Sequence, residues 1–162
     1  MSEARRSYQA RLETPFGVVG VRTAGNAIAE IVYLPRSVGA LAPTDTLAAR
    51  ACRQIESYLH DPDFQWNLPL ARRGTPFQRR VWRKIAAIES GRTRSYGEIA
   101  RELGSAPRAV GQACGSNPLP LVIPCHRVVA SGGIGGFAHH EGGFHLSVKR
   151  WLLAHEGAPT AR

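Results

Sequence analysis

The sequence predicts a mixed α/β protein of the α+β type, with a small N-terminal domain and a mostly helical C-terminal domain. Three observations predict it: alternating apolar and polar residues near the N-terminus, one amphipathic segment after them, and helix-capping patterns in the second half. With 162 residues the chain is long enough for two small domains. We place the domains at residues 1–74 and 75–162, with the boundary near Gly74.

The N-terminal domain is predicted to contain an antiparallel three-stranded sheet and one helix. Segments that alternate apolar and polar residues are separated by the turn sequences TPFG and AGN, and they cover residues 7–13, 17–23 and 27–34. Apolar residues then recur at helical spacing over residues 44–61, where Thr44 or Asp45 is placed to cap the helix.

The C-terminal domain opens with two helices that begin with capping boxes. Thr75 is followed three residues later by Gln78, and Ser95 by Glu98, so each pair is placed to satisfy backbone amides at a helix start. A tight turn at Gly104 then precedes a short helix. Two short helices around such a turn form a helix-turn-helix pattern.

Charge and composition restrict the class of protein. The net charge is +9 and the isoelectric point about 10.5, which favours a polyanionic partner, although 19 of the 21 basic residues are arginines and a compositional bias explains them equally well. No run of 18 apolar residues predicts a membrane span, and the N-terminus has no secretory pattern. We therefore expect a cytoplasmic protein that makes no membrane contact.

The three cysteines contain no CxxC pair, so neither a disulfide framework nor a structural zinc site is expected. Cys125 stands out because His126 follows it and three prolines precede it within eight residues. We expect the apolar residues before Cys125 to form a strand that the prolines hold extended. An imidazole within reach, directly or through one water, can take the thiol proton. A buried cysteine beside a surface histidine remains the alternative.

Other residues are placed to support such a thiol. Glu156, at the end of the last helix, is able to orient His126, although a solvated glutamate is equally consistent with this position. Asn117 is suited to brace the turn before Cys125. The helix that follows Gly104 is rich in small residues, which suit either a narrow DNA groove or simple helix packing. It displays Arg108 and Gln112 as its long polar side chains.

The chain resembles the O6-alkylguanine-DNA alkyltransferases, also called methylated-DNA–protein-cysteine methyltransferases. The motifs that carry this resemblance are IPCHRVV at 123–129, RAVGQACGSNP at 108–118 and KRWLLAHEG at 149–157. It covers residues 75–157 by motif. The N-terminal segments are compatible with the family's first domain by pattern, and the resemblance implies a ribonuclease H-like fold there.

The resemblance implies a set of catalytic roles. Cys125 would accept the alkyl group from O6 of guanine and keep it as a thioether, so each molecule would react once. His126 would deprotonate Cys125 through a bound water, Glu156 would orient His126, and Asn117 would brace the turn. No cofactor and no metal are implied.

The resemblance also implies how DNA is held. Double-stranded DNA would bind through its minor groove, and the damaged base would rotate out of the stack. Tyr96 would contact the base and the neighbouring phosphate, and Arg108 would fill the gap in the stack. The backbone carbonyls of Cys125 and Val128 would accept hydrogen bonds from the base. Further DNA contacts are expected from Ala109, Gly111 and Gln112, and further pocket positions are Cys114, Gly142 and Gly143.

The sequence departs from the family pattern in two places. The link between Gly104 and Arg108 is shorter than usual, and the loop at 137–145 is longer and rich in histidine. Glu141 joins Gly142 and Gly143 as a candidate for the backbone amide that would contact O6. The loop histidines (His139, His140 and His145) lack cysteine or acidic partners at metal-ligand spacing, so no metal is expected.

Three other functions are compatible with some of these features. A lesion-binding relative without activity is disfavoured because Cys125 is present, and a transcription regulator because extra zinc-binding cysteines are lacking. A cysteine–histidine hydrolase would regenerate its thiol, whereas a thioether persists. We expect a monomer that acts on O6-alkylguanine. The alkyl size preference and activity on O4-alkylthymine stay open at this stage.

Overall fold

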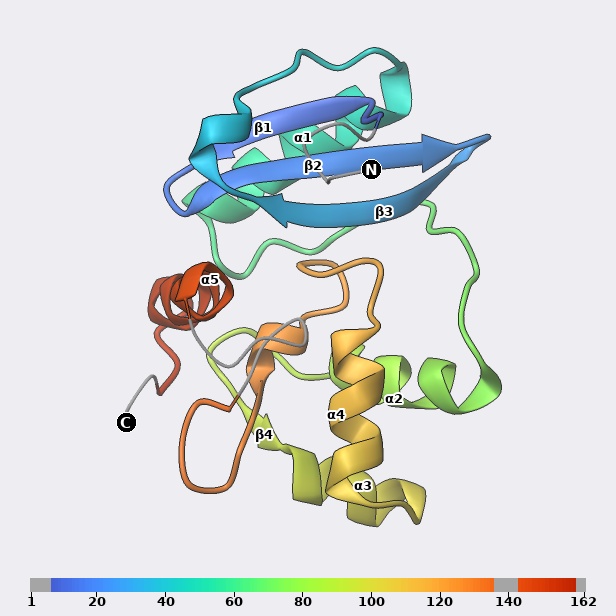
Figure 1. Ribbon diagram of the computed structural model, residues 1–162, viewed down its shortest axis with the longest axis vertical. Coiled ribbons are helices and arrows are strands. Elements are labelled where there is room, and N and C mark those ends of the chain that lie inside the picture. Colours follow the sequence, from blue (N-terminus) through green and yellow to red (C-terminus); the bar gives the residue numbers. More distant parts are fainter. Residues whose placement is uncertain (1–6, 136–142, 160–162) are drawn as a thin grey trace. The chain divides into compact units, whose positions relative to one another are not determined.

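A computed structural model describes residues 7–135 and 143–159 of the chain. It divides into two compact units, Met1–Arg72 and Arg73–Arg162, close to the predicted boundary at Gly74. The predicted mixed α/β fold is confirmed: one unit contains an antiparallel sheet with a helix, and the other is mostly helical (Figure 1). The ribonuclease H-like description of the first unit stays a prediction.

The first unit contains a three-stranded antiparallel sheet in the order β1-β2-β3, and one helix packs against it (Figure 1). The predicted strands and helix are confirmed, with bounds β1 Ala10–Thr14, β2 Gly17–Ala24, β3 Ala27–Leu34 and α1 Thr46–His60. A short 3-10 helix, η2 Arg36–Val38, follows β3. Asp45 is the cap of α1, because its carboxylate accepts a hydrogen bond from Ala48 N at 2.7 Å.

The central strand β2 is buried on both faces of the sheet. Helix α1 contacts all three strands. A separate apolar cluster contains Tyr8, Val18 and Leu34. Gly20 lets this cluster close, because a Cβ atom at that position would lie 2.6 Å from the Tyr8 ring. The core of this unit is therefore built almost wholly from apolar side chains.

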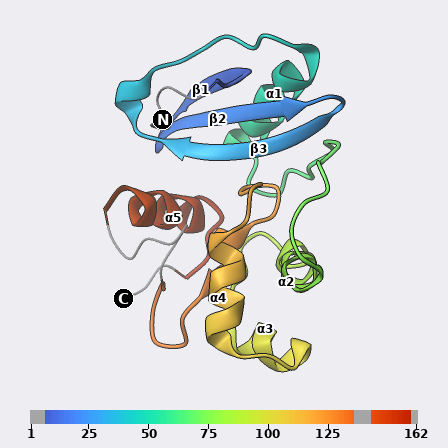
Figure 2. The same cartoon turned by 45° about the vertical axis from the view of Figure 1, so that its right-hand side comes forward.

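The described residues of the second unit form four α-helices, and Figure 2 shows α3 and α4 side by side with α2 next to α4. Their bounds are α2 Pro76–Ala86, α3 Tyr96–Leu103, α4 Pro107–Gly115 and α5 Gly143–His155. Both predicted capping boxes are present, and Gly104 ends α3 in the left-handed conformation with φ of 64°. Trp82 Nε1 ties α2 to α4 through a 2.8 Å hydrogen bond to the carbonyl of Ala113.

The segment before Cys125 differs from its prediction. The expected strand is wrong: the chain from Pro118 to Pro124 forms turns, and Cys125–Arg127 is a 3-10 helix, η3. The prolines have no backbone N–H groups to donate to a neighbouring strand. Leu121 also takes a positive φ of 74°, which no strand allows. Pairing begins only afterwards, where the two-residue strand β5 Val128–Val129 lies parallel to β4 Arg94–Ser95.

Candidate active site

Asn117 holds the turn that presents Cys125. Its side-chain amide donates to the carbonyl of Ile123 at 2.8 Å and to Cys125 Sγ at 3.0 Å. Its Oδ1 atom accepts from the amide of Leu119 at 2.9 Å. One side chain therefore fixes both ends of the turn and contacts the sulfur, which is the brace expected from the sequence.

The thiol of Cys125 is held in its protonated form. It is 5% exposed, and burial raises its pKa well above the usual value, as does the neighbouring Cys114. The hydrogen bond from Asn117 and the charge of Lys149 act in the opposite direction. Because the thiolate is the reactive form, this sulfur needs a nearby base to become nucleophilic.

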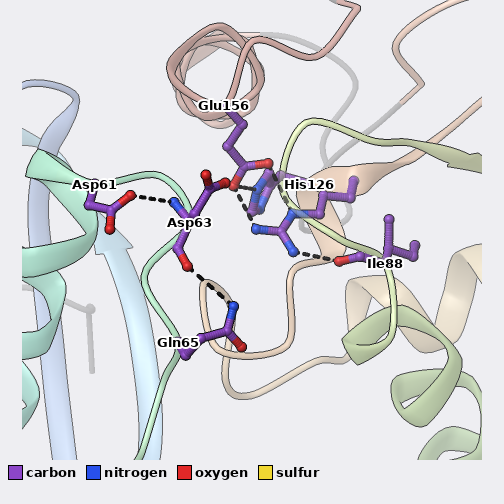
Figure 3. A network of polar contacts seen from close by, with 7 residues as sticks. Asp61, Asp63, Gln65, Ile88, His126 and Glu156 are labelled. Atoms are coloured by element: carbon purple, nitrogen blue, oxygen red, sulfur yellow. Dashed lines mark hydrogen bonds and ion pairs between the residues drawn. The ribbon is translucent and has the colours of Figure 1, made fainter.

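His126 is buried next to Cys125 in the chain and is oriented by Glu156. Its Nε2 atom lies 2.8 Å from Glu156 Oε2, as the sequence predicted, and the ring is 1% exposed (Figure 3). Burial lowers the pKa of His126, so the ring is neutral near pH 7. An ionised carboxylate only accepts, so Nε2 carries the proton and Nδ1 presents a lone pair. Nδ1 is buried and has no hydrogen-bond partner among the described residues.

Arg127 fixes the carboxylate that orients His126. Its Nε and Nη2 atoms each donate to Glu156 at 2.9 Å, and Nη1 donates to the carbonyl of Ile88 at 2.5 Å. Figure 3 shows the Glu156 carboxylate next to the His126 ring at the end of α5. The bidentate pair keeps Glu156 ionised and in place. Sequence analysis missed Arg127, although its position within the PCHRV motif could have indicated it.

Lys149 is a second residue that sequence analysis did not place in the site. Its side chain is 0% exposed, and Nζ donates to the carbonyl of Val128 at 2.8 Å. Burial lowers its pKa to about 8, against the opposing effect of Cys114 and Cys125. A lysine within the apolar stripe of α5 was the available signal, because a surface lysine would not occur there. The carbonyl keeps a second lone pair for a ligand.

Tyr96 lies near both sulfurs of the second unit. Burial raises its pKa, and the charges of Cys114 and Cys125 add to that effect. A Cβ atom at Gly135 would lie 3.1 Å from the Tyr96 ring, and one at Gly111 would lie 4.0 Å from it. A side chain at Gly135 would therefore crowd the Tyr96 ring, whereas one at Gly111 would make ordinary van der Waals contact with it.

Helix α4 exposes the polar residues that the sequence assigned to DNA. Arg108 and Gln112 are exposed and one helical turn apart, and Ala109 is half-buried between them. Cys114 faces the opposite way and is buried, 9% exposed. The helix thus turns one face to solvent and brings the other to Tyr96 and Cys125.

Some predicted residues cannot be placed. Glu141, Gly142, His139 and His140 lie outside the described residues, whereas Gly143 begins α5 and is exposed. In the described ranges 7–135 and 143–159, no cluster of three metal-ligating side chains occurs. Over those same ranges, none of the helices has the length and apolar character needed to cross a membrane.

The site combines a buried thiol, a neutral imidazole and an ionised carboxylate beside a helix-turn-helix, which is the arrangement of a cysteine nucleophile with a general base. Residues 76–158 match the family described as "6-O-methylguanine DNA methyltransferase, DNA binding domain". The chain belongs to this family.

Individual relatives agree with this assignment. The chain is 50% identical over 92 residues to the methylated-DNA–protein-cysteine methyltransferase of Shigella flexneri, covering 56% of this chain and 52% of the relative. It is 47% identical over 111 residues to that of Mycolicibacterium paratuberculosis, covering 67% and 64%. The matched region thus spans about half to two thirds of the length of these curated relatives.

Solved structures match over almost the whole chain. The crystal structure of Mycobacterium tuberculosis O6-methylguanine methyltransferase has a TM-score of 0.76 at 31% identity, covering 96% of this chain and 97% of that one. The crystal structure of Mycobacterium tuberculosis OGT in complex with DNA has a TM-score of 0.74 at 33% identity, covering 92% and 93%.

Proposed function

We propose that this chain is a DNA-repair methyltransferase that moves the alkyl group of O6-alkylguanine in DNA to its own Cys125. The observation that carries the proposal is the buried His126–Glu156 pair beside a protonated thiol. Membership of the family and the names of the relatives support the substrate class. O4-alkylthymine in DNA is a second candidate substrate of the same thiol.

The proton of the thiol leaves first. A water molecule links Cys125 Sγ to Nδ1 of His126, and the imidazole accepts the proton that this water relays. Glu156 stabilises the resulting imidazolium, while Arg127 keeps that carboxylate ionised. The charge of Lys149 and the hydrogen bond from Asn117 stabilise the thiolate that remains.

The thiolate then attacks the alkyl carbon. A carbon–sulfur bond forms as the carbon–oxygen bond breaks, and its electron pair stays with the guanine oxygen. The guanine anion takes up a proton at N1, which balances the thiol proton that His126 accepted, and guanine is restored. The thioether has no simple route back to a thiol, so each molecule reacts once.

The alkylated base must leave the duplex to reach a sulfur that is 5% exposed. The small residues of α4 enter the minor groove, and Arg108 occupies the gap that the base leaves, which offsets part of the few kcal/mol of unstacking. The contacts to guanine come from Tyr96 and from the backbone carbonyls of Cys125 and Val128. Sequence-independent phosphate contacts dominate the affinity for double-stranded DNA, and the protein acts as a monomer.

The first experiment is intact mass spectrometry after incubation with duplex DNA that carries one O6-methylguanine. The expected result is a gain of about 14 Da on each protein molecule, located on Cys125, with no further gain on adding substrate. The controls are an unmodified duplex and Cys125→Ser, and neither gains mass.

Two results would contradict the proposal. Tight binding of the lesion without a mass gain would indicate a recognition protein instead of a methyltransferase. Repeated product formation with an unmodified thiol would indicate turnover, as in a cysteine hydrolase.

A further inference from the structure

Cys114 is a second thiol in the immediate surroundings of Cys125. Cys125 Sγ lies 3.5 Å from the backbone carbonyl oxygen of Cys114, and the neighbouring Cys114 side chain helps to raise the pKa of Cys125. Since the carbonyl oxygen is joined to the α-carbon by two bonds, the Cys125 sulfur is within roughly 6 Å of Cys114 Cα. With the sulfur this close to the Cys114 backbone, a disulfide requires the Cys114 side chain to turn toward Cys125 and the two Cα atoms to lie about 4.4–6.8 Å apart.

The two sulfurs share the same neighbours. Charges on Cys114 and Cys125 both act on the phenol of Tyr96 and on the ammonium group of Lys149. Both thiols are buried and free. They come from different elements, the end of α4 and the start of η3, which the turn braced by Asn117 brings together.

A sulfur that reacts once is lost if it is oxidised past the sulfenic acid. Any condition that generates the Cys125 thiolate also makes this sulfur more reactive toward peroxide. A neighbouring thiol converts the sulfenic acid into a disulfide, which thiol reductants reverse, before the irreversible sulfinic acid forms.

We propose that Cys114 is a resolving thiol that protects Cys125 from irreversible oxidation. A two-electron oxidant such as hydrogen peroxide converts the Cys125 thiolate to a sulfenic acid and releases hydroxide. The Cys114 thiol attacks that sulfur, a Cys114–Cys125 disulfide forms, and water leaves with the thiol proton. A dithiol reductant then restores both thiols and is itself oxidised to a disulfide.

The inference rests on the reactivity that the proposed function gives to Cys125, but it can be tested without DNA. The full chain is treated with increasing hydrogen peroxide, and its intact mass is measured without reductant. The expected species is about 2 Da lighter than the thiol form, and peptide mapping joins Cys114 to Cys125. Dithiothreitol then restores at least about half of the initial methyl acceptance from O6-methylguanine DNA.

Cys114→Ser separates this role from general oxidation. Each variant is compared with its own untreated sample, so a change in initial activity does not affect the result. In Cys114→Ser we expect Cys125 to gain about 32 Da as a sulfinic acid, and recovery to fall about tenfold below that of the wild type. Cys52→Ala is the matched control, since Cys52 is the remaining cysteine, and it should behave like the wild type.

Equal recovery in Cys114→Ser and wild type would overturn the inference, as would a disulfide that contains Cys52. The proposed function is tested separately on the same preparation, by measuring methyl acceptance from O6-methylguanine DNA. If the untreated protein accepts a methyl group but peroxide produces no Cys114–Cys125 disulfide, only the resolving role is contradicted. A Cys114–Cys125 disulfide in a protein that never accepts a methyl group contradicts only the methyltransferase.

Discussion

Cys52 and Cys125 are two buried cysteines in different units, and only one of them has the surroundings of a nucleophile. Cys52 lies on α1 in a core of apolar side chains, and burial raises its pKa to about 11. Cys125 is equally buried but is contacted by Asn117 and lies near the charge of Lys149. Burial alone makes a thiol inert, and polar groups placed around it are what allow it to react.

The same contrast holds for whole units. Among the described residues, the buried acidic, basic and histidine side chains all belong to the second unit: His126, Arg127, Lys149 and Glu156. In the first unit the buried polar residue is Thr14, whose hydroxyl bonds to the backbone of its own turn. Burying charge is costly unless it is paired, so the second unit retains these groups at a cost in stability that the proposed function would explain.

The largest expected effect separates the two thiols. Cys125→Ser should abolish methyl acceptance, because a serine hydroxyl at this site is far less nucleophilic than a thiolate. Cys52→Ala should keep the full single-turnover rate. Transfer of a radiolabelled methyl group from O6-methylguanine duplex measures both. Loss of transfer in Cys52→Ala alone would reverse the assignment.

Glu156→Gln should give the next largest effect. It removes the charge that orients His126 and balances Arg127, so we expect the transfer rate to fall by about a hundredfold or more. Leaving Arg127 buried without its carboxylate should also lower the free energy of unfolding by about 3–5 kcal/mol. Single-turnover kinetics and urea unfolding measure the two effects. Glu89→Gln, at an exposed position, is the control and should change neither.

Lys149 predicts a pH dependence of stability. Burial lowers the pKa of Lys149 from 10.5 to about 8 in the folded protein, so between these pH values the unfolded chain holds a proton that the folded chain lacks. The contribution of Lys149 to the free energy of unfolding therefore rises as the pH increases from about 8 to 10.5. Below pH 8 this contribution is constant.

Urea unfolding of the wild type and Lys149→Met tests this sign. The unfolding free energy of the wild type relative to the variant should rise by about 3 kcal/mol over that range. Lys84→Met is the matched control, because Lys84 is the other lysine of the chain and lies partly exposed on α2. A flat difference for Lys149→Met would mean that the folded protein does not depress this pKa.

Arg108→Ala should have the smallest of these effects and should depend on the substrate. Transfer from duplex DNA should slow by about tenfold, because no side chain then fills the gap that the rotated base leaves in the stack. Transfer from a free O6-methylguanine nucleoside should be unchanged. Arg53→Ala removes an equal charge from an exposed position of α1 and serves as the control. Equal slowing with both substrates would place Arg108 in the chemistry instead of in base rotation.

Local patterns predicted most of the fold. The strands of the first unit, the helix α1 and both capping boxes follow from residues close together in the chain, so alternation and helix-start signals were sufficient. The strand expected before Cys125 was wrong, although apolar residues and the extended backbone that proline favours had indicated it. The prolines and the left-handed backbone at Leu121 favour turns there.

The sequence by itself predicted the mixed α/β fold, the adjacent Cys125–His126 pair and the resemblance to the family. Only the tertiary structure decided which charged groups surround that pair. Arg127 meets Glu156 across 29 residues, and Lys149 meets Val128 across 21. Cys114 reaches Cys125 because the turn braced by Asn117 folds back on α4. Such contacts depend on long-range packing and burial, which local periodicity does not encode, and burial is what sets the pKa of each of these groups.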